Sequence, residues 1–226
     1  MKILLIEDEE NLSSSIIDYL ILDGYVCETC TTFEMALEKI NLYNYDCIVV
    51  DIMLPDGNGL DIIKKLKSTN KATGIIIISA KKSLDDKIIG LEIGADDYLT
   101  KPFNISELNA RIKSIIRRRN FNGKNEIIFN EIKVFPDQLK VVINETELIL
   151  TKKEYNLLVY FMSNKDRFVT KESIAEHLWG DEMDMANSFD FIYSHIKNLR
   201  KKIIVLGGND YIKTVYGIGY KFTDSI

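Results

Sequence analysis

The sequence feature that most restricts the fold is a run of four isoleucines, Ile75 to Ile78, inside the segment 74–79. A β-strand places successive side chains on opposite faces of its sheet, so this run is apolar on both faces. Strands of that kind are typical of parallel sheets that helices cover on both sides. The run therefore predicts an inner strand of an α/β domain.

The rest of the first 119 residues alternates between short apolar runs and segments with helical spacing of apolar residues. The predicted strands are 2–6, 25–30, 47–50, 74–79 and 97–99. The predicted helices are 10–22, 33–42, 58–68, 84–93 and 105–119. Five strand–helix repeats predict a doubly wound, five-stranded parallel sheet of the flavodoxin-like class.

The second half of the chain has a different pattern, after a polar stretch at 120–125 that we interpret as a linker. The predicted strands are 127–130, 132–135, 139–143, 147–150, 211–215 and 220–223. Helices are predicted from residue 151, at 171–178 and at 188–204. This order predicts an α+β domain at 126–226 that follows the first domain at 1–119 and closes with a hairpin.

The composition of the 226-residue chain is that of a soluble globular protein, with 46% hydrophobic and 28% charged residues. Its net charge of −5 means that any DNA contact must come from a local basic patch. The apolar start is too short for a signal peptide, and no segment reaches transmembrane length. We therefore expect a cytoplasmic protein without a membrane partner, and three cysteines without framework spacing favour the same compartment.

Polar side chains follow the predicted parallel strands at their carboxyl ends, where open α/β sheets bind ligands. In chain order they are Glu7, Asp8, Asp51, Ser79 and Lys101. Neighbouring carboxylates repel one another unless a cation joins them, and a hard divalent cation such as Mg²⁺ takes oxygen ligands. Together with an ammonium group, this pocket suits the transfer of a phosphoryl group to a carboxylate.

The same residues lie in four longer motifs, which are 6–9 (IEDE), 50–57 (VDIMLPDG), 79–80 (SA) and 94–103 (GADDYLTKPF). These motifs closely resemble the receiver domain of two-component response regulators, and the resemblance covers about residues 1–119. It implies that Asp51 accepts a phosphoryl group from a sensor histidine kinase. It also implies that Asp8, Asp51 and the backbone carbonyl of Met53 bind Mg²⁺, and that Glu7 acts through water.

The resemblance further implies how phosphorylation changes the domain. Ser79 moves toward the phosphoryl group, which Lys101 also contacts, and Tyr98 then swings inward. The Lys101–Pro102 peptide bond is expected to be cis, a state that is reached mainly before proline. Receivers of this kind catalyse only their own phosphoryl transfer and slow autodephosphorylation, so we do not expect an enzyme in the ordinary sense.

Resemblance to the OmpR/PhoB subfamily implies a homodimer of the phosphorylated chain, formed by the face of helix 84–93, strand 97–99 and helix 105–119. The residues predicted for this interface are Lys87, Ile88, Leu91, Asp96, Asp97, Glu107, Ala110 and Arg111. By the same resemblance Lys87 would meet Glu107 across the interface, and Asp97 would meet Arg111. A two-fold axis would form each pair twice.

The segment 191–202 contains four basic residues and no acidic residue. A basic helix face that can also donate hydrogen bonds is typical of a helix in the DNA major groove. The motifs 150–158 (LTKKEYNLL), 178–180 (LWG), 195–202 (HIKNLRKK) and 214–220 (TVYGIGY) resemble the winged-helix effector domain of the same subfamily. The residues predicted to contact promoter DNA are Tyr193, Ser194, Lys197, Asn198, Arg200, Lys201, Lys202 and Tyr216.

Two positions depart from the subfamily, because many members have arginine where this chain has Asn198 and Tyr216. Tyr216 offers a ring and a hydroxyl to the minor groove, whereas an arginine would gain from the potential of a narrow groove. Asn198 can bind an adenine edge or a phosphate. The departures leave the base preference open, and they leave the promoters, the stimulus and the direction of regulation undefined.

The sequence therefore predicts a phosphorylation-dependent transcription regulator, with RNA polymerase as a further partner. One alternative is a constitutive DNA binder whose receiver works without phosphorylation, although the intact Asp51, Ser79 and Lys101 argue against it. Another is an enzyme on the same flavodoxin-like sheet. A flavin site needs a phosphate-binding loop after the first strand, where this chain instead has four acidic residues at 7–10.

Overall fold

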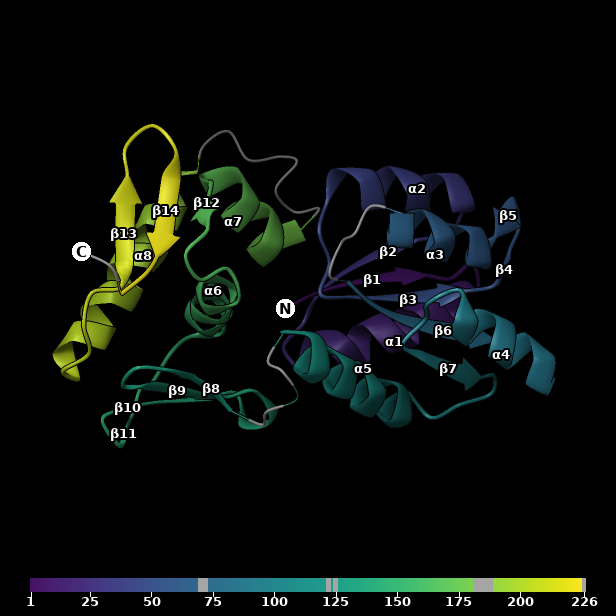
Figure 1. Ribbon diagram of the computed structural model, residues 1–226, viewed down its shortest axis with the longest axis horizontal. Coiled ribbons are helices and arrows are strands. Elements are labelled where there is room, and N and C mark those ends of the chain that lie inside the picture. Colours follow the sequence, from purple (N-terminus) through teal and green to yellow (C-terminus); the bar gives the residue numbers. More distant parts are fainter. Residues whose placement is uncertain (69–72, 121–122, 124–125, 181–188, 225–226) are drawn as a thin grey trace. The chain divides into compact units, whose positions relative to one another are not determined.

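The computed structural model describes the chain except for residues 69–72, 121–122, 124–125, 181–188 and 225–226 (Figure 1). The chain divides into two compact units, Lys2–Arg119 and Asn120–Ile226. Most of the predicted linker 120–125 lies outside the described residues, and so does residue 188, the predicted start of the last helix.

The first unit contains a five-stranded sheet with the order β2-β1-β3-β6-β7. All neighbouring strands are parallel, and these strands are β1 (Lys2–Ile6), β2 (Val26–Cys30), β3 (Cys47–Asp51), β6 (Gly74–Ser79) and β7 (Asp97–Thr100). The helices are α1 (Glu10–Leu22), α2 (Phe33–Leu42), α3 (Gly59–Ser68), α4 (Leu84–Glu92) and α5 (Ile105–Asn120). This is the doubly wound order with helices on both faces of the sheet, so the predicted fold class is confirmed.

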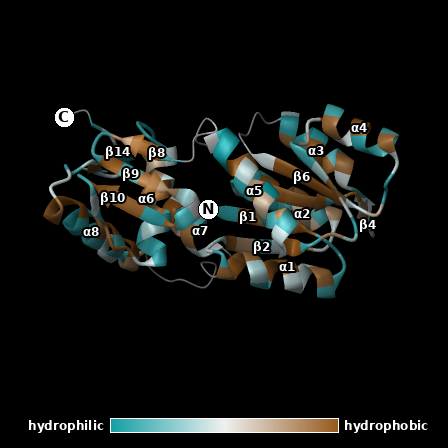
Figure 2. Ribbon diagram, turned by 90° about the horizontal axis from the view of Figure 1, so that it is seen from below, coloured by the Kyte–Doolittle hydropathy of each residue, from teal (hydrophilic) through white to brown (hydrophobic). Residues whose placement is uncertain are grey.

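The four isoleucines of β6 are buried on both faces, and at most 1% of each is exposed. In Figure 2 the strands of this sheet are predominantly hydrophobic, whereas the helices alternate between hydrophilic and hydrophobic residues. Each helix therefore covers the sheet with one face and meets solvent with the other. This arrangement leaves the carboxyl ends of the strands as the polar edge of the unit.

A short antiparallel hairpin lies between β3 and α3, and the sequence analysis did not predict it. It consists of β4 (Met53–Leu54) and β5 (Gly57–Asn58). The backbone amide of Gly59 donates to the carbonyl of Ile52 at 2.9 Å, which closes the loop behind the hairpin. A Cβ atom on Gly59 would lie 2.0 Å from the carbonyl oxygen of Asp51, so only glycine allows this close approach.

The second unit begins with a sheet of order β11-β10-β9-β8 and ends with one of order β12-β14-β13. The strands of the first sheet are β8 (Ile127–Phe129), β9 (Ile132–Phe135), β10 (Lys140–Ile143) and β11 (Thr146–Glu147). Those of the second are β12 (Phe168–Val169), β13 (Ile212–Val215) and β14 (Gly219–Phe222). Between them lie α6 (Lys152–Ser163), α7 (Lys171–Trp179) and α8 (Asp190–Val205). The predicted α+β order is confirmed, with the two-residue strand β12 as an addition.

Helix α6 begins with a capping box. The side chain of Thr151 accepts from the backbone of Glu154, whose carboxylate accepts from the backbone amide of Thr151 at 2.8 Å. Helix α8 buries Ile192, Ile196 and Leu199 against the unit and turns its other face outward. None of the described helices is long and apolar enough to span a membrane.

Candidate functional site

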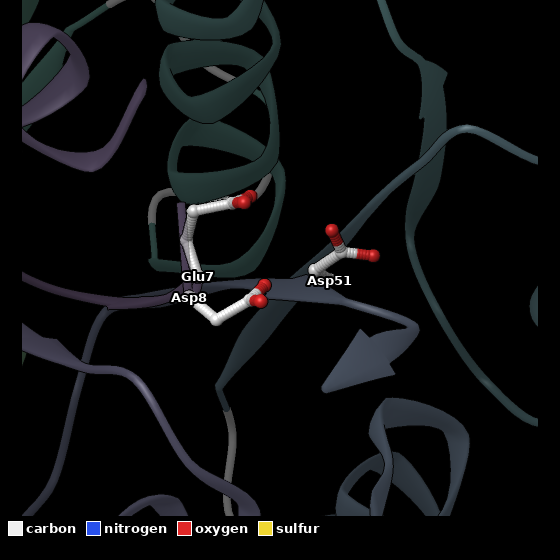
Figure 3. Close-up of side chains that lie close together, drawn as sticks. All are labelled: Glu7, Asp8 and Asp51. Atoms are coloured by element: carbon white, nitrogen blue, oxygen red, sulfur yellow. The ribbon is translucent and has the colours of Figure 1, made fainter. Parts of the chain in front are cut away.

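Three carboxylates meet at the carboxyl ends of β1 and β3. Glu7 and Asp8 follow β1, Asp51 ends β3, and one ligand oxygen from each lies within 4.8 Å of the others (Figure 3). The strand register explains the meeting, because Ile6 of β1 pairs with Val50 of β3. Glu7 and Asp51 are buried and Asp8 is exposed, so the cluster has one solvent-facing side.

Lys101, which follows β7, joins two of these carboxylates. Its Nζ atom lies 2.7 Å from Oε1 of Glu7 and 2.6 Å from Oδ2 of Asp51. Its backbone amide donates to the carbonyl of Ser79 at 2.8 Å, so the lysine is fixed to the end of β6. The peptide bond between Lys101 and Pro102 is cis, as the family resemblance implied.

The charges of the pocket shift the acid–base properties of two groups. Burial raises the pKa of Glu7 above its ordinary value, and the hydrogen bond and charge of Lys101 offset only part of this effect. Burial opposes the charged form of Lys101, but its bonds to Asp51 and Glu7 outweigh that effect and raise its pKa. Lys101 therefore stays an ammonium group at neutral pH.

The residues at this edge suit a hard divalent cation such as Mg²⁺. The donors are carboxylate oxygens, and among the described residues Oε2 of Glu7 is buried without a hydrogen-bond partner. The backbone of Met53 adjoins the cluster, because its amide donates to Oδ1 of Asp51 at 2.9 Å. The predicted set of Glu7, Asp8, Asp51 and the Met53 backbone thus lies together.

Ser79 and Tyr98 are linked through the main chain of Lys81. The Oγ atom of Ser79, which is fully buried, accepts from the amide of Lys81 at 3.2 Å. The hydroxyl of Tyr98 donates to the carbonyl oxygen of Lys81 at 3.1 Å, and its ring packs against the core cluster of the first unit. No sequence pattern marks Lys81 as part of this link, because the link uses backbone atoms that any residue type provides.

The face formed by α4, β7 and α5 carries most of the residues predicted for a dimer. Ile88, Leu91 and Ala110 are exposed there, while Lys87 is half-buried. Within the single chain, Arg111 lies 2.7 Å from both Asp97 and Glu107. The arginine is thus already paired with two acids of the same face.

Asp96 has a role inside the unit that the sequence analysis did not predict. One carboxylate oxygen accepts from the backbone amide of Ile75 at 2.8 Å, and the other lies 2.8 Å from Nη2 of Arg119. Asp96 therefore ties the start of β6 to the end of α5. Its neighbour Asp97 contacts another arginine of α5, Arg111.

The outer face of α8 presents most of the residues predicted to contact DNA. Its exposed side chains are Tyr193, Ser194, Lys197, Asn198 and Lys201. A groove of about 560 Å³ runs between this face and the β13–β14 hairpin. Tyr216 lies at the turn of that hairpin with 95% of its surface exposed.

Two of the four predicted DNA-contacting cations on α8 are paired with acids of the same unit. Nε of Arg200 donates to Oδ1 of Asp210 at 3.0 Å, and Nζ of Lys202 lies 2.6 Å from Oε2 of Glu154. Burial raises the pKa of Glu154, but the hydrogen bond from Lys202 helps to outweigh this effect, and its pKa is lowered. Lys197 and Lys201 thus carry most of the positive charge on the exposed face.

Both halves of the chain match families of known proteins. The model of the response regulator receiver domain matches residues 3–113, and that of the transcriptional regulatory protein, C terminal, matches residues 145–222. Response regulator ArlR of Staphylococcus haemolyticus (strain JCSC1435) is 39% identical over 218 residues, which are 96% of this chain and 97% of that protein.

A solved receiver domain agrees with the first of these matches. The receiver domain of Francisella response regulator 1452 is 38% identical, with a TM-score of 0.50 over 52% of this chain and 97% of that one. Response regulator DrrB, a Thermotoga maritima OmpR/PhoB homolog, is 31% identical over 98% of each chain, with a TM-score of 0.48. The chain therefore belongs to the response regulator family of the OmpR/PhoB type, with a receiver domain followed by a DNA-binding transcription regulator domain.

Proposed function

We propose that this chain is a phosphorylation-controlled transcription regulator and that Asp51 accepts the phosphoryl group from a sensor histidine kinase. The observation that carries the proposal is the position of Asp51, buried between an acidic cluster and the ammonium group of Lys101 at 2.6 Å. The proposed domains are a receiver at 1–119, a linker at 120–125 and a winged-helix effector at 126–226.

In this reaction a carboxylate oxygen of Asp51 attacks the phosphorus atom of the phosphohistidine on the kinase. The P–N bond breaks, and the imidazole leaves with the electron pair and is protonated from solvent. Asp8, Asp51 and the carbonyl of Met53 would hold Mg²⁺, and Glu7 would act through water. The cation, when bound, neutralises charge on the phosphoryl oxygens. The ammonium group of Lys101 contributes a second positive charge. Because the phosphoryl group is bound to the receiver's own Asp51, the chain catalyses only its own phosphoryl transfer and slow autodephosphorylation.

Ser79 and Tyr98 serve as the switch that responds to the phosphoryl group. The hydroxyl of Ser79 accepts from the Lys81 amide at 3.2 Å, so a phosphoryl oxygen that draws this hydroxyl toward itself also pulls on the main chain at Lys81. The Lys81 peptide also holds the hydroxyl of Tyr98, so a shift of this segment reaches the aromatic ring directly. A local change in charge at Asp51 thereby shifts the α4–β7–α5 face toward the conformation that dimerises.

Phosphorylation then promotes a two-fold dimer through that face. Its residues are Lys87, Ile88, Leu91, Asp96, Asp97, Glu107, Ala110 and Arg111. Ile88 and Leu91 supply exposed apolar area for contact. The Lys87–Glu107 and Asp97–Arg111 pairs across the axis require Arg111 to exchange its partners within the chain for those of the second copy.

The dimer places two effector domains on promoter DNA. Helix α8 enters the major groove, and Tyr216 at the turn of the β13–β14 hairpin contacts the DNA next to that groove. The residues of α8 that contact DNA are Tyr193, Ser194, Lys197, Asn198, Arg200, Lys201 and Lys202. Lys197 and Lys201 meet phosphates, while Ser194 and Asn198 face the base edges. RNA polymerase is the further partner through which bound regulators change transcription.

Labelling with acetyl phosphate in the presence of Mg²⁺ tests the acceptor. Wild-type chain should gain one phosphoryl group in intact-mass spectra, and Asp51→Ala should gain none. Asp61→Ala is the matched control, because Asp61 is an exposed aspartate whose ion pair with Lys64 lies on the surface of α3. Labelling of Asp51→Ala at the wild-type rate would refute the assignment.

A phosphorylation-independent DNA binder remains the competing function, and the same protein preparations distinguish it. The proposal predicts that beryllofluoride, which mimics the phosphoryl group, tightens binding of wild type to DNA but leaves Asp51→Ala unchanged. Equal affinity of treated and untreated wild type for DNA would favour the constitutive binder.

A further inference from the structure

The turn of the β4–β5 hairpin is bonded to the start of α2 by the carboxylate of Asp56. Oδ1 of Asp56 accepts from the backbone amide of Phe33 at 2.6 Å, and Oδ2 accepts from that of Glu34 at 3.1 Å. The two segments are more than twenty residues apart in the sequence. This carboxylate has no role in the proposed phosphoryl transfer.

Asp56 completes the cap of α2 with groups that the helix cannot supply itself. The first amide groups of a helix have no partner within it, and Thr32 satisfies only the amide of Met35, at 3.2 Å through its side chain. Asp56 accepts from the two amides that precede Met35, those of Phe33 and Glu34. The hydrogen bond from Phe33 contributes most to lowering the pKa of Asp56, so the carboxylate is ionised beside the positive end of the helix.

A second contact holds the same hairpin on the helix. A Cβ atom on Gly57 would lie 2.6 Å from Cγ of Phe33, so the aromatic side chain packs directly on the glycine. Gly57 pairs with Leu54 in the hairpin, and Asn58 pairs with Met53. Met53 thus belongs to a hairpin whose turn is held at the start of α2 by Asp56 and Gly57.

The hairpin also adjoins the acidic cluster on its other side. The amide of Met53 donates to Oδ1 of Asp51 at 2.9 Å, two residues along the chain. The amide of Gly59 donates to the carbonyl of Ile52 at 2.9 Å, so the segment between Asp51 and α3 forms a closed loop. Movement of its turn would move the Met53 peptide relative to Asp51.

We propose that Asp56 is a positioning residue for the divalent-cation site. By bonding the hairpin turn to α2, it fixes the backbone of Met53 where a cation between Asp8 and Asp51 can use its carbonyl oxygen. This inference rests on the proposed function, which assigns that carbonyl to Mg²⁺. It adds a residue that touches neither the cation nor the phosphoryl group.

Calorimetric titration of the full chain with MgCl₂ tests the inference. Asp56→Ala should weaken Mg²⁺ binding by on the order of 10-fold, the scale of residues that orient metal ligands. Asp56→Asn keeps an acceptor oxygen and should retain most of the affinity. Labelling by acetyl phosphate should need more Mg²⁺ in Asp56→Ala but should reach the wild-type rate at saturation, because the acceptor itself is intact.

Thr32→Ala is the matched control, because it removes the other cap of α2 without touching the hairpin. It should lower thermal stability about as much as Asp56→Ala does, yet keep wild-type Mg²⁺ affinity. Equal loss of Mg²⁺ affinity in both variants would overturn the inference, since helix stability alone would then explain the effect. Unchanged affinity in Asp56→Ala would overturn it too, while failure of wild type to bind Mg²⁺ would remove the proposed function itself.

Discussion

Glu28 lies in the first unit with its carboxylate between two lysines. Its oxygens are 2.6 Å from Nζ of Lys2 and 3.0 Å from Nζ of Lys39, and the hydroxyl of Tyr45 donates to it at 2.6 Å. Lys2 is fully buried, so its charge depends on this carboxylate for compensation. A buried ion pair is costly to break because the remaining charge stays desolvated.

We therefore predict that Glu28→Gln lowers the free energy of unfolding of the first unit by about 3–5 kcal/mol. Urea titration followed by far-ultraviolet circular dichroism measures this loss. The single tryptophan, Trp179, lies in the second unit, so its fluorescence should report an unchanged transition there. Asp61→Asn, which removes an exposed pair, should cost less than about 1 kcal/mol. A similar cost for both variants would contradict the prediction.

The same carboxylate predicts a dependence of stability on pH. Burial alone would raise the pKa of Glu28, but hydrogen bonds from Lys2, Tyr45 and Lys39 outweigh it and lower the pKa below 4.5. The stabilisation is thus present above the unfolded pKa and is lost as pH falls through the folded value. The difference in urea midpoint between wild type and Glu28→Gln should be full near pH 7 and shrink below about pH 4. A constant difference would show that Glu28 does not act through its charge.

Within helix α8, two neighbouring lysines have different surroundings. Lys201 is exposed, whereas Lys202 lies 2.6 Å from the buried carboxylate of Glu154. Lys201→Ala should reduce the slope of log K against log salt by about 0.9, the loss of one phosphate contact. Lys202→Ala should reduce the slope by less than Lys201→Ala does, because the Lys202 ammonium is already paired with Glu154, and it should lower the melting temperature. Fluorescence anisotropy with a labelled mixed-sequence duplex measures the slopes, and equal slopes for both variants would refute the distinction.

The sequence was sufficient to predict the long elements, because β6 carries an unbroken apolar run that is buried on both faces and α8 carries apolar residues at helical spacing that face the core. It was insufficient for β12 and the β4–β5 hairpin, since strands of two residues have no measurable period. Sequence also marked the residues of the acidic site, which follow strands at one edge. The pairing of Arg200 with Asp210 and of Lys202 with Glu154 could not be predicted, because it depends on how α8 packs on the rest of its unit.

For the complete chain, phosphorylation should shift the oligomeric state from monomer to dimer. Beryllofluoride-treated wild type should sediment as a dimer, and treated Arg111→Ala should dimerise on the order of 10-fold more weakly because a two-fold axis removes its contact twice. Lys113→Ala is the control on the same helix, since Lys113 pairs with Asp23 at 2.8 Å instead. Treated wild type that stays monomeric well above cellular concentrations would exclude this mode of assembly.

The link between Ser79 and Tyr98 has a consequence for how sequences of this kind can diverge. Its middle member contributes an amide and a carbonyl, which are present whatever side chain stands at Lys81. Substitutions at that position can therefore accumulate without breaking the connection, apart from proline, which lacks the amide hydrogen. A comparison of side chains would therefore not reveal this position as part of the switch. Substitutions there would leave the link between Ser79 and Tyr98 intact unless they displaced the backbone.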